Sequence, residues 1–345
     1  MRILVTGISG FAGSALLPRL LDEGHEVRAL ARDRTRVEVA LGSLALRSKD
    51  AVSFEDFELT IGDTLSGAGL LGAMRGVEVA YYLIHSMEPY AGEAGGAGGT
   101  SFPARERASA ETFAQAARAA GVERIVYLGG PLPPAQGPPP APDTSARAAT
   151  EKAGSRLSPH LSSRNAVERI LLDAIPDSVA LRASIVVGAR SRSFRFLVRL
   201  IERMPVLALP AWRRFRSRPV DERDIVEMLA SCASTRTVSG RTLEAGGPEI
   251  LTYGEIVERI AGLMMLGRPS LGIGVTVTPI AARLAAAIAG ERPELVLPLM
   301  ESLTADLLPA GQDAAELLNV ELHSFDAAVE HALGEWEKTE PLAAR

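Results

Sequence analysis

The stretch MRILVTGISGFAGSALLPRLLDEGHEVRALARD, residues 1–33, decides how this chain begins to fold. A short apolar run at Ile3–Val5 enters the glycine-rich turn GISGFAG at residues 7–13. A helical pattern at Phe11–Glu23 then leads to a second apolar run at Val27–Leu30. Glycines spaced in this way between a strand and a helix allow a tight turn and close approach of a pyrophosphate to the helix N-terminus. The sequence therefore predicts a dinucleotide-binding βαβ unit at its start.

Short apolar runs continue to alternate with helical patterns beyond residue 33. The expected strands and helices are Phe57–Ile61, Leu65–Met74, Val79–Ile84, Arg105–Ala120, Arg124–Leu128 and Val179–Val187. This alternation is typical of a parallel sheet with helices on both faces. We predict an α/β fold with a Rossmann-type, doubly wound parallel sheet in residues 1–180. Residues 181–345 are expected to form a smaller, mostly helical substrate or cap region, partly interleaved with the sheet.

Composition excludes several classes of partner. A net charge of −5 argues against nucleic acid, whose binding requires a basic surface. A single cysteine, Cys232, and five scattered histidines show no metal-ligand spacing, so no metal site is expected. The lone cysteine and a strand that starts at Ile3 without a leader favour a cytoplasmic protein. The apolar stretch Leu271–Gly290 is interrupted by Pro279 and favours a packed helix over membrane contact.

The glycine turn supplies the first group of expected cofactor contacts. Gly7 permits the turn, Gly10 lets the backbone approach the pyrophosphate, and Gly13 allows close helix packing. We expect cofactor contacts from the whole turn: Gly7, Ser9, Gly10, Phe11, Ala12 and Gly13.

The end of the second strand indicates which dinucleotide is bound. Ala31 stands where an NAD-preferring protein would carry an acid, and Arg32 follows with a planar fork suited to a 2′-phosphate. The sequence therefore favours NADP(H), with NAD as the alternative. Asp33 complicates the assignment, because it could pair with Arg32 or repel a phosphate. Arg32 could also be a solvated loop charge.

At these motifs the chain resembles the extended and atypical short-chain dehydrogenase/reductases. More narrowly, it resembles the NAD(P)H-binding group related to NmrA-like proteins and to the nucleotide-binding accessory subunit of respiratory complex I. The resemblance is carried by Thr6–Gly13, Ile61–Asp63, Ala80–Met87, Arg124–Gly130, Leu157–Arg164, Leu181–Gly188 and Glu244–Pro248. It implies that Asp63 meets adenine and that Leu83, Ile84 and His85 line the nicotinamide side. The alternatives are that Asp63 is a strand-end turn residue and that His85 merely ends a strand.

The proton relay usual in that superfamily is missing. Members that act on carbonyls use a Ser, a Tyr and a Lys four residues after the Tyr. Here Gly129-Gly130 occupies the serine position, and the best match to the tyrosine and lysine is His160 and Arg164. In one interpretation His160 is a substitute general acid/base and Arg164 positions ribose or an anionic substrate. In the other, both residues are structural.

Three further segments have no assigned role. Residues 86–100 are rich in glycine and residues 129–150 in proline, so they are either lids over the ligand edge or tolerated surface insertions. A basic stretch follows the strand region at 179–187 and contains Arg190, Arg192, Arg195, Arg199, Arg203, Arg213, Arg214, Arg216 and Arg218. It suits an anionic ligand, partner or membrane surface, or it is a solvated helix face.

The sequence favours an NADP(H)-dependent oxidoreductase acting on a small molecule. The alternative from another class is a non-catalytic NADP(H)-binding regulator or assembly factor, which the missing relay favours. A sugar-nucleotide epimerase or dehydratase is disfavoured, since that chemistry also uses the absent tyrosine.

Overall fold

The computed structural model describes residues 1–45, 52–84, 102–132, 159–272, 288, 305–340 and 342, with only the backbone at 159 and 160. His85, residues 86–100, residues 133–150 and most of Leu271–Gly290 therefore lie outside the described residues. In the described ranges, no helix combines the length and apolar character needed to cross a membrane.

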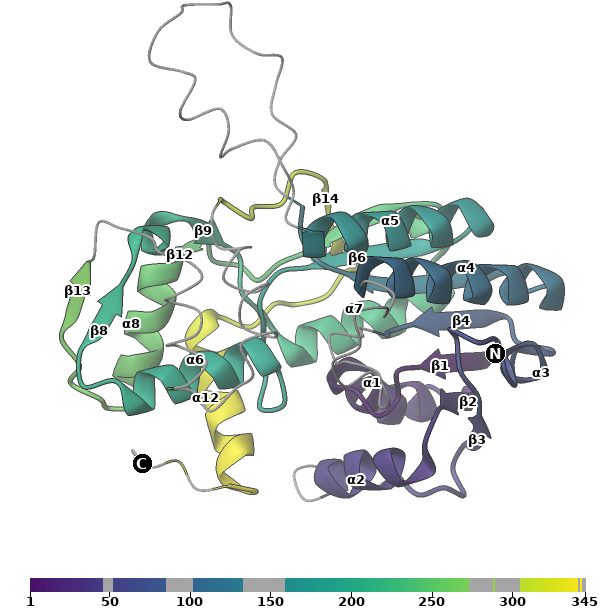
Figure 1. Cartoon of the computed structure of the whole chain (residues 1–345), viewed down its shortest axis with the longest axis horizontal. Coiled ribbons are helices and arrows are strands. Elements are labelled where there is room, and N and C mark those ends of the chain that lie inside the picture. The colour runs from purple at the N-terminus through teal and green to yellow at the C-terminus, as the bar shows by residue number, and fades with distance from the viewer. Residues whose placement is uncertain are drawn as a thin grey trace, which may run out of the picture.

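One parallel sheet organises the larger part of the molecule (Figure 1). Its order in the described chain is β14-β11-β6-β5-β4-β1-β2-β3. Every pairing in it is parallel. The strands are β1 Arg2–Thr6, β2 Glu26–Ala31, β3 Glu58–Ile61, β4 Val79–Tyr82, β5 Arg124–Gly129, β6 Val179–Ala183, β11 Thr242–Ala245 and β14 Gln312–Asp313. Strand order reverses between β1 and β4, which is where open α/β sheets bind ligands. The predicted doubly wound fold is confirmed.

Helices cover both faces of this sheet because its strands alternate their side chains between two cores. Ile3 and Val5 of β1 pack into one core, whereas Leu4 between them packs into the other. The first core lies under α1 (Phe11–Asp22), α2 (Arg34–Ala45), α7 (Glu222–Ser234) and α11 (Ala314–Leu318). The second lies under α3 (Leu70–Met74), α4 (Phe102–Ala120) and α5 (Pro159–Ala174).

A separate apolar cluster forms the other part of the molecule, at the left of Figure 1. Its largest fully buried side chains are Phe194, Phe325 and Trp336. The helices are α6 Arg192–Arg203, α8 Tyr253–Leu263 and α12 Phe325–Glu337, with η1 Ala211–Arg214. Short strand pairs join them: β7 Val186–Val187 with β10 Val220–Asp221, β8 Leu207–Leu209 with β13 Ser270–Gly272, and β9 Arg216–Ser217 with β12 Leu251–Thr252. A further 3-10 turn, η2 Arg236–Val238, follows α7.

The structure differs from the pattern expected from sequence in two places. The helix expected at Leu65–Met74 starts only at Leu70, since Gly67 and Gly69 take left-handed backbone angles in the preceding turn. Beyond residue 180, β11 and β14 extend the sheet from distant segments.

Candidate functional site

The glycine turn joins β1 to α1 in a conformation that other residues would obstruct. Gly7 has φ of 73°, and a Cβ there would lie 2.7 Å from the Leu83 carbonyl oxygen. A Cβ on Gly13 would lie 2.8 Å from the Gly7 carbonyl carbon. A Cβ on Gly10 would meet only the Gly7 oxygen, at 3.0 Å. Gly7 and Gly13 are thus required by internal packing, whereas at Gly10 no second atom lies within 4 Å of the added Cβ.

The first turn of α1 is suited to an anion. Gly10 is the N-cap, without a capping side chain, and the first turn carries no acidic residue. Backbone N–H groups at a helix start have no partners within the helix and carry partial positive charge. The turn therefore presents donors where a pyrophosphate would lie.

The end of β4 lies against this turn. Thr6 Oγ1 donates to the Tyr81 carbonyl oxygen at 2.8 Å and accepts from the Leu83 N–H at 3.3 Å. Leu83 and Ile84 are partly buried. The structure thus brings Leu83 beside Gly7, although the two residues are distant in sequence.

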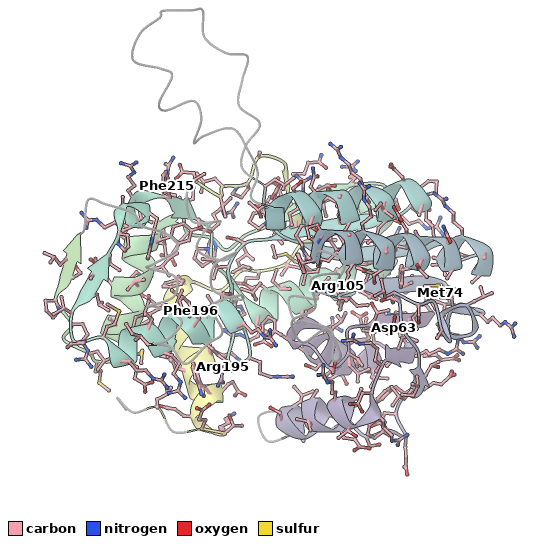
Figure 2. All side chains as sticks on the ribbon, viewed as in Figure 1. Asp63, Met74, Arg105, Arg195, Phe196 and Phe215 are labelled. Atoms are coloured by element: carbon pink, nitrogen blue, oxygen red, sulfur yellow. The ribbon has the colours of Figure 1, made fainter. Side chains whose placement is uncertain are left out.

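Arg32 and Asp63 follow neighbouring strands. Ala31 of β2 is paired with Ile61 of β3, and the Gly62 N–H donates to the Ala31 carbonyl oxygen at 2.9 Å. Asp63 Oδ1 accepts from the N–H groups of Leu65 and Ser66 at 2.7 and 2.8 Å. Asp63 therefore shapes the turn after β3, on the sheet side of the molecule in Figure 2.

The start of α2 determines what Asp33 does. Asp33 Oδ1 accepts from the Thr35 N–H at 2.9 Å, so this carboxylate supports the start of the helix. Arg34 pairs with Glu38 at 3.1 Å and lies over the Phe54 ring at 4.4 Å. Arg32 is exposed between β2 and α2.

The position of the missing relay is occupied by a buried arginine. His160 lies in the first turn of α5, and its side chain is outside the described part. The Arg164 guanidinium donates to the Leu128 carbonyl oxygen and lies 5.1 Å from the centre of the Tyr127 ring. Gly130 follows β5, and a Cβ there would meet open space. Arg164 thus braces α5 against β5.

The tyrosines of the sheet do not replace the missing one. Tyr81, Tyr82 and Tyr127 are at most 2% exposed. The Tyr81 hydroxyl donates to the Leu229 carbonyl oxygen at 2.8 Å, and that of Tyr82 to Ser109 Oγ at 3.0 Å. Burial raises the pKa of Tyr127 to about 12. These hydroxyls are enclosed in the core and are poorly placed to exchange protons with a ligand.

A contact that sequence reasoning missed crosses the glycine turn. Arg190, which follows β7, donates from its guanidinium to Ser14 Oγ in α1. Ser14 Oγ in turn donates to the Gly10 carbonyl oxygen at 2.7 Å. A Cβ on Gly188 would lie 2.9 Å from the Phe11 ring and would also collide with Glu222. Only the presence of Arg190 in the basic stretch pointed toward this contact.

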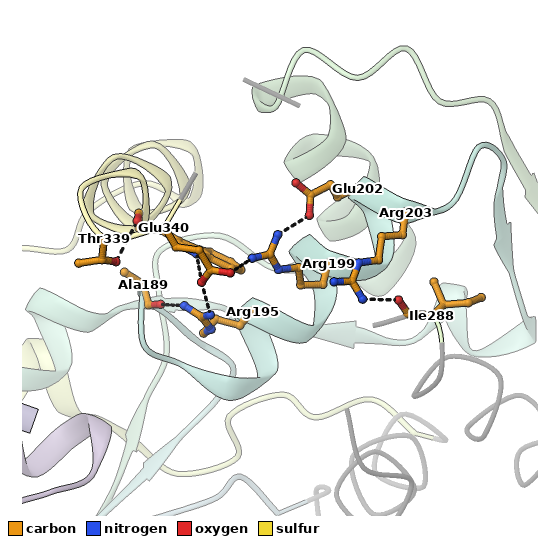
Figure 3. Close-up of polar contacts among 9 residues, drawn as sticks. Ala189, Arg195, Arg199, Glu202, Arg203, Ile288, Thr339 and Glu340 are labelled. Atoms are coloured by element: carbon orange, nitrogen blue, oxygen red, sulfur yellow. Dashed lines mark hydrogen bonds and ion pairs between the residues drawn. The ribbon is translucent and has the colours of Figure 1, made fainter. Parts of the chain in front are cut away.

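Four other described arginines of the basic stretch bind the chain's own acids. Arg195 and Arg199 both donate to Glu340, and both guanidinium groups lie over the buried Trp336 ring, at 4.1 and 4.9 Å (Figure 3). Arg199 also pairs with Glu202 at 2.6 Å. Further along, Arg216 pairs with Asp306 at 2.7 Å and Arg218 with Asp313 at 3.0 Å. These four guanidinium groups are therefore paired with carboxylates of the chain itself.

The described residues contain no group of three or more histidine, cysteine, aspartate or glutamate side chains arranged to hold a metal ion.

Comparison with solved structures shows the same fold in epimerases and a reductase. UDP-glucuronic acid 4-epimerase from Bacillus cereus, in complex with UDP-glucuronic acid and NAD, is 16% identical with a TM-score of 0.67, over 99% of this chain and 100% of that one. UDP-glucose 4-epimerase from Thermotoga maritima, with UDP-glucose, is 13% identical with a TM-score of 0.65, over 98% and 99%. Triphenylmethane reductase from Citrobacter sp., complexed with NADP(H), is 15% identical with a TM-score of 0.65, over 96% and 100%.

Sequence comparison supplies the family. No curated protein matches the chain. A family model does match, over residues 3–208, which include the glycine turn, the six strands from β1 to β6 and the segment carrying Arg190. This confirms the resemblance to the extended short-chain dehydrogenase/reductases. Since the match extends over more than half of its 345 residues, this chain belongs to the NAD dependent epimerase/dehydratase family.

Proposed function

We propose that this protein binds NADP(H) at the glycine turn and uses it to reduce a small organic molecule. The observation that carries the binding proposal is the turn itself, which lies at the reversal of strand order. Gly7 and Gly13 have no room for a Cβ there, and the first helical turn offers uncapped N–H groups. Family membership supports a nicotinamide dinucleotide as the ligand.

The choice of NADP(H) over NAD(H) rests on the end of β2. Arg32 is exposed directly after the strand, next to the turn that Asp63 shapes. The Asp33 carboxylate accepts from Thr35, which directs it toward the start of α2. Asp33 is thereby engaged in a helix start, and Arg32 is the residue that we assign to the 2′-phosphate.

The proposed substrate class follows from the missing proton relay. Reduction of an ordinary carbonyl creates an alkoxide, which needs a proton donor nearby. The described tyrosines of the sheet are buried, and Arg164 is engaged with β5. We therefore propose an acceptor whose reduction needs no proton from the protein. A delocalised organic cation becomes neutral on hydride addition, and a quinone gives a hydroquinone anion that takes its proton from water. A triphenylmethane reductase and UDP-sugar epimerases share this fold alike, so the preference for a reductase over an epimerase rests on the missing tyrosine and not on the fold.

A non-catalytic NADP(H)-binding regulator is the second candidate. It is favoured by the bracing position of Arg164, which donates to the Leu128 carbonyl oxygen where the family's lysine would approach the cofactor.

Titration of NADPH and NADH against wild-type protein and Arg32→Ala tests the cofactor proposal. We expect Arg32→Ala to weaken NADPH binding by about tenfold to hundredfold, the value of one charge-assisted bidentate contact, with NADH binding unchanged. Arg34→Ala is the matched control, because Arg34 is directed toward Glu38 and Phe54. Equal affinity of the wild-type protein for the two dinucleotides would contradict the assignment.

Oxidation of NADPH in the presence of cationic dyes, quinones, enones and simple carbonyls then separates the two candidate functions. Turnover with the first two classes supports the reductase. Tight NADPH binding with no oxidation by any class supports the regulator.

A further inference from the structure

Arg190 is placed at the glycine turn by a segment far from it in sequence. Its guanidinium donates to Ser14 Oγ, and the same hydroxyl donates to the carbonyl oxygen of Gly10, the N-cap of α1. Arg190 therefore lies beside the first turn of the helix whose N–H groups face the proposed pyrophosphate. Arg190 is half-buried, which strengthens its interaction with an anion relative to a fully solvated side chain.

The segment carrying Arg190 is anchored on both sides. Toward the sheet, Gly188 packs against the Phe11 ring so closely that a Cβ would lie 2.9 Å from it. Toward α6, the Ser191 N–H donates to the Gly188 carbonyl oxygen at 3.0 Å, and Ser191 is the N-cap of that helix.

The beginning of α6 is held in turn by the clasp of Arg195, Arg199, Trp336 and Glu340 (Figure 3). Arg195 donates to Glu340 at 2.8 Å, as does the Trp336 indole at 3.0 Å. Arg195 also donates to the Ala189 carbonyl oxygen at 3.4 Å, directly before Arg190. The clasp thus contacts the backbone directly before Arg190, while the bond to Ser14 orients the Arg190 side chain itself.

The negative charge of a pyrophosphate explains why a cationic side chain would be useful beside the first turn of α1. A dinucleotide pyrophosphate carries two negative charges, and the first turn of α1, Phe11-Ala12-Gly13-Ser14, contains no basic side chain. Backbone N–H groups supply only partial charge. A guanidinium has five N–H donors in a planar fork and can hold a hydroxyl and a phosphate oxygen together.

We propose that Arg190 is a ligand of the cofactor pyrophosphate, reaching it across the glycine turn from the segment between β7 and α6. This inference rests on the proposed function. The two arginines have different expected effects. Arg32 is assigned to the 2′-phosphate, which only NADPH carries, whereas Arg190 contacts the pyrophosphate, which NADPH and NADH share. Arg190 should therefore strengthen the binding of both dinucleotides without favouring either.

The experiment measures Kd for NADPH and NADH, at several salt concentrations, with wild-type protein, Arg190→Ala, Arg190→Lys and Arg216→Ala. We expect Arg190→Ala to weaken both dinucleotides by the same factor, about tenfold to hundredfold, and to flatten the dependence of Kd on salt. Arg190→Lys, which keeps the charge but loses the fork, should recover part of the affinity. Arg216→Ala removes an equal charge from the same stretch, at an exposed pair with Asp306, and should change neither constant.

The outcomes separate this inference from the function on which it rests. Wild-type protein that binds neither dinucleotide overturns the proposed function itself. Wild-type protein that binds both, with Arg190→Ala binding equally well, overturns only the role of Arg190. A loss of affinity that follows the loss of folded protein, with an unchanged salt dependence, assigns Arg190 to packing and also overturns the proposal. If Arg190→Ala does not fold, Arg190→Lys replaces it in the comparison with wild type. Weaker binding of both dinucleotides by the same factor then supports the role of Arg190, and unchanged binding overturns it.

Discussion

Replacing Gly10 by valine separates dinucleotide binding from folding, because the structure places different constraints on the glycines of the turn. A Cβ on Gly10 meets a single atom, the Gly7 oxygen, at 3.0 Å. The folding cost is therefore mainly that of a poor N-cap, about 1 kcal/mol, which a domain stable by about 5–15 kcal/mol tolerates. The added methyl groups occupy the path of the pyrophosphate to the helix. Losing two such charged hydrogen bonds, at about 1.5–3 kcal/mol each, lowers affinity by more than about a hundredfold.

Two control variants sharpen the test. Gly13→Ala puts a methyl group 2.8 and 3.0 Å from backbone atoms of Gly7 and Ile8, so we expect a folding cost of about 1–3 kcal/mol from overpacking. Gly42→Ala, in α2 with no atom within 4 Å of the new Cβ, should stabilise the protein by up to about 1 kcal/mol and leave binding unchanged. Thermal unfolding and calorimetric titration of NADPH are measured on all three variants. Near-native NADPH affinity in Gly10→Val would place the dinucleotide elsewhere and refute the reasoning.

Further predictions concern the clasp and the relay position. Glu340→Gln should destabilise the protein by about 1–2 kcal/mol, a value discounted for the partly exposed carboxylate, whereas Glu335→Gln, which breaks a surface pair with Lys338, should change stability by less than about 0.5 kcal/mol in denaturant unfolding. The hydrogen bond from Arg195 lowers the pKa of Glu340, so its contribution is complete above the ordinary carboxyl pKa and is lost as pH falls through the lowered folded value. The stability difference between wild type and Glu340→Gln should therefore shrink below about pH 4, and a difference constant from pH 7 to pH 3 would contradict this account. For a carbonyl substrate, His160→Gln should lower turnover by about a hundredfold with NADPH affinity unchanged, and native turnover would remove His160 from the chemistry.

Local patterns were sufficient to predict the six strands from β1 to β6 and the glycine turn between β1 and α1. The continuous apolar run in β1 and the spacing of Gly7, Gly10 and Gly13 are both properties of residues close together in the chain. The same local reasoning placed Leu83 and Arg32 at strand ends that the structure brings to the glycine turn and to the neighbouring end of β3.

Other features depended on contacts that no local pattern encodes. The sequence did not indicate that Arg164 would bond to the end of β5, because a helix position specifies a direction but not a partner. The basic stretch suggested an external anion, a partner or a solvated face, yet four of its arginines pair with Glu340, Asp306 and Asp313, which lie between 90 and 145 residues further along.

The sequence by itself determined the βαβ unit at the start of the chain, because the apolar run of a strand, the spacing of glycines and the start of a helix are properties of neighbouring residues. What only the tertiary structure decided is which distant side chains meet that unit. Arg190 reaches Ser14 across 176 positions of sequence, and it does so because β6, β7 and α6 return the chain to the edge where β1 ends. Such a contact depends on the order of strands in the sheet and on the packing of the second apolar cluster against it. A pattern in neighbouring residues therefore cannot predict it.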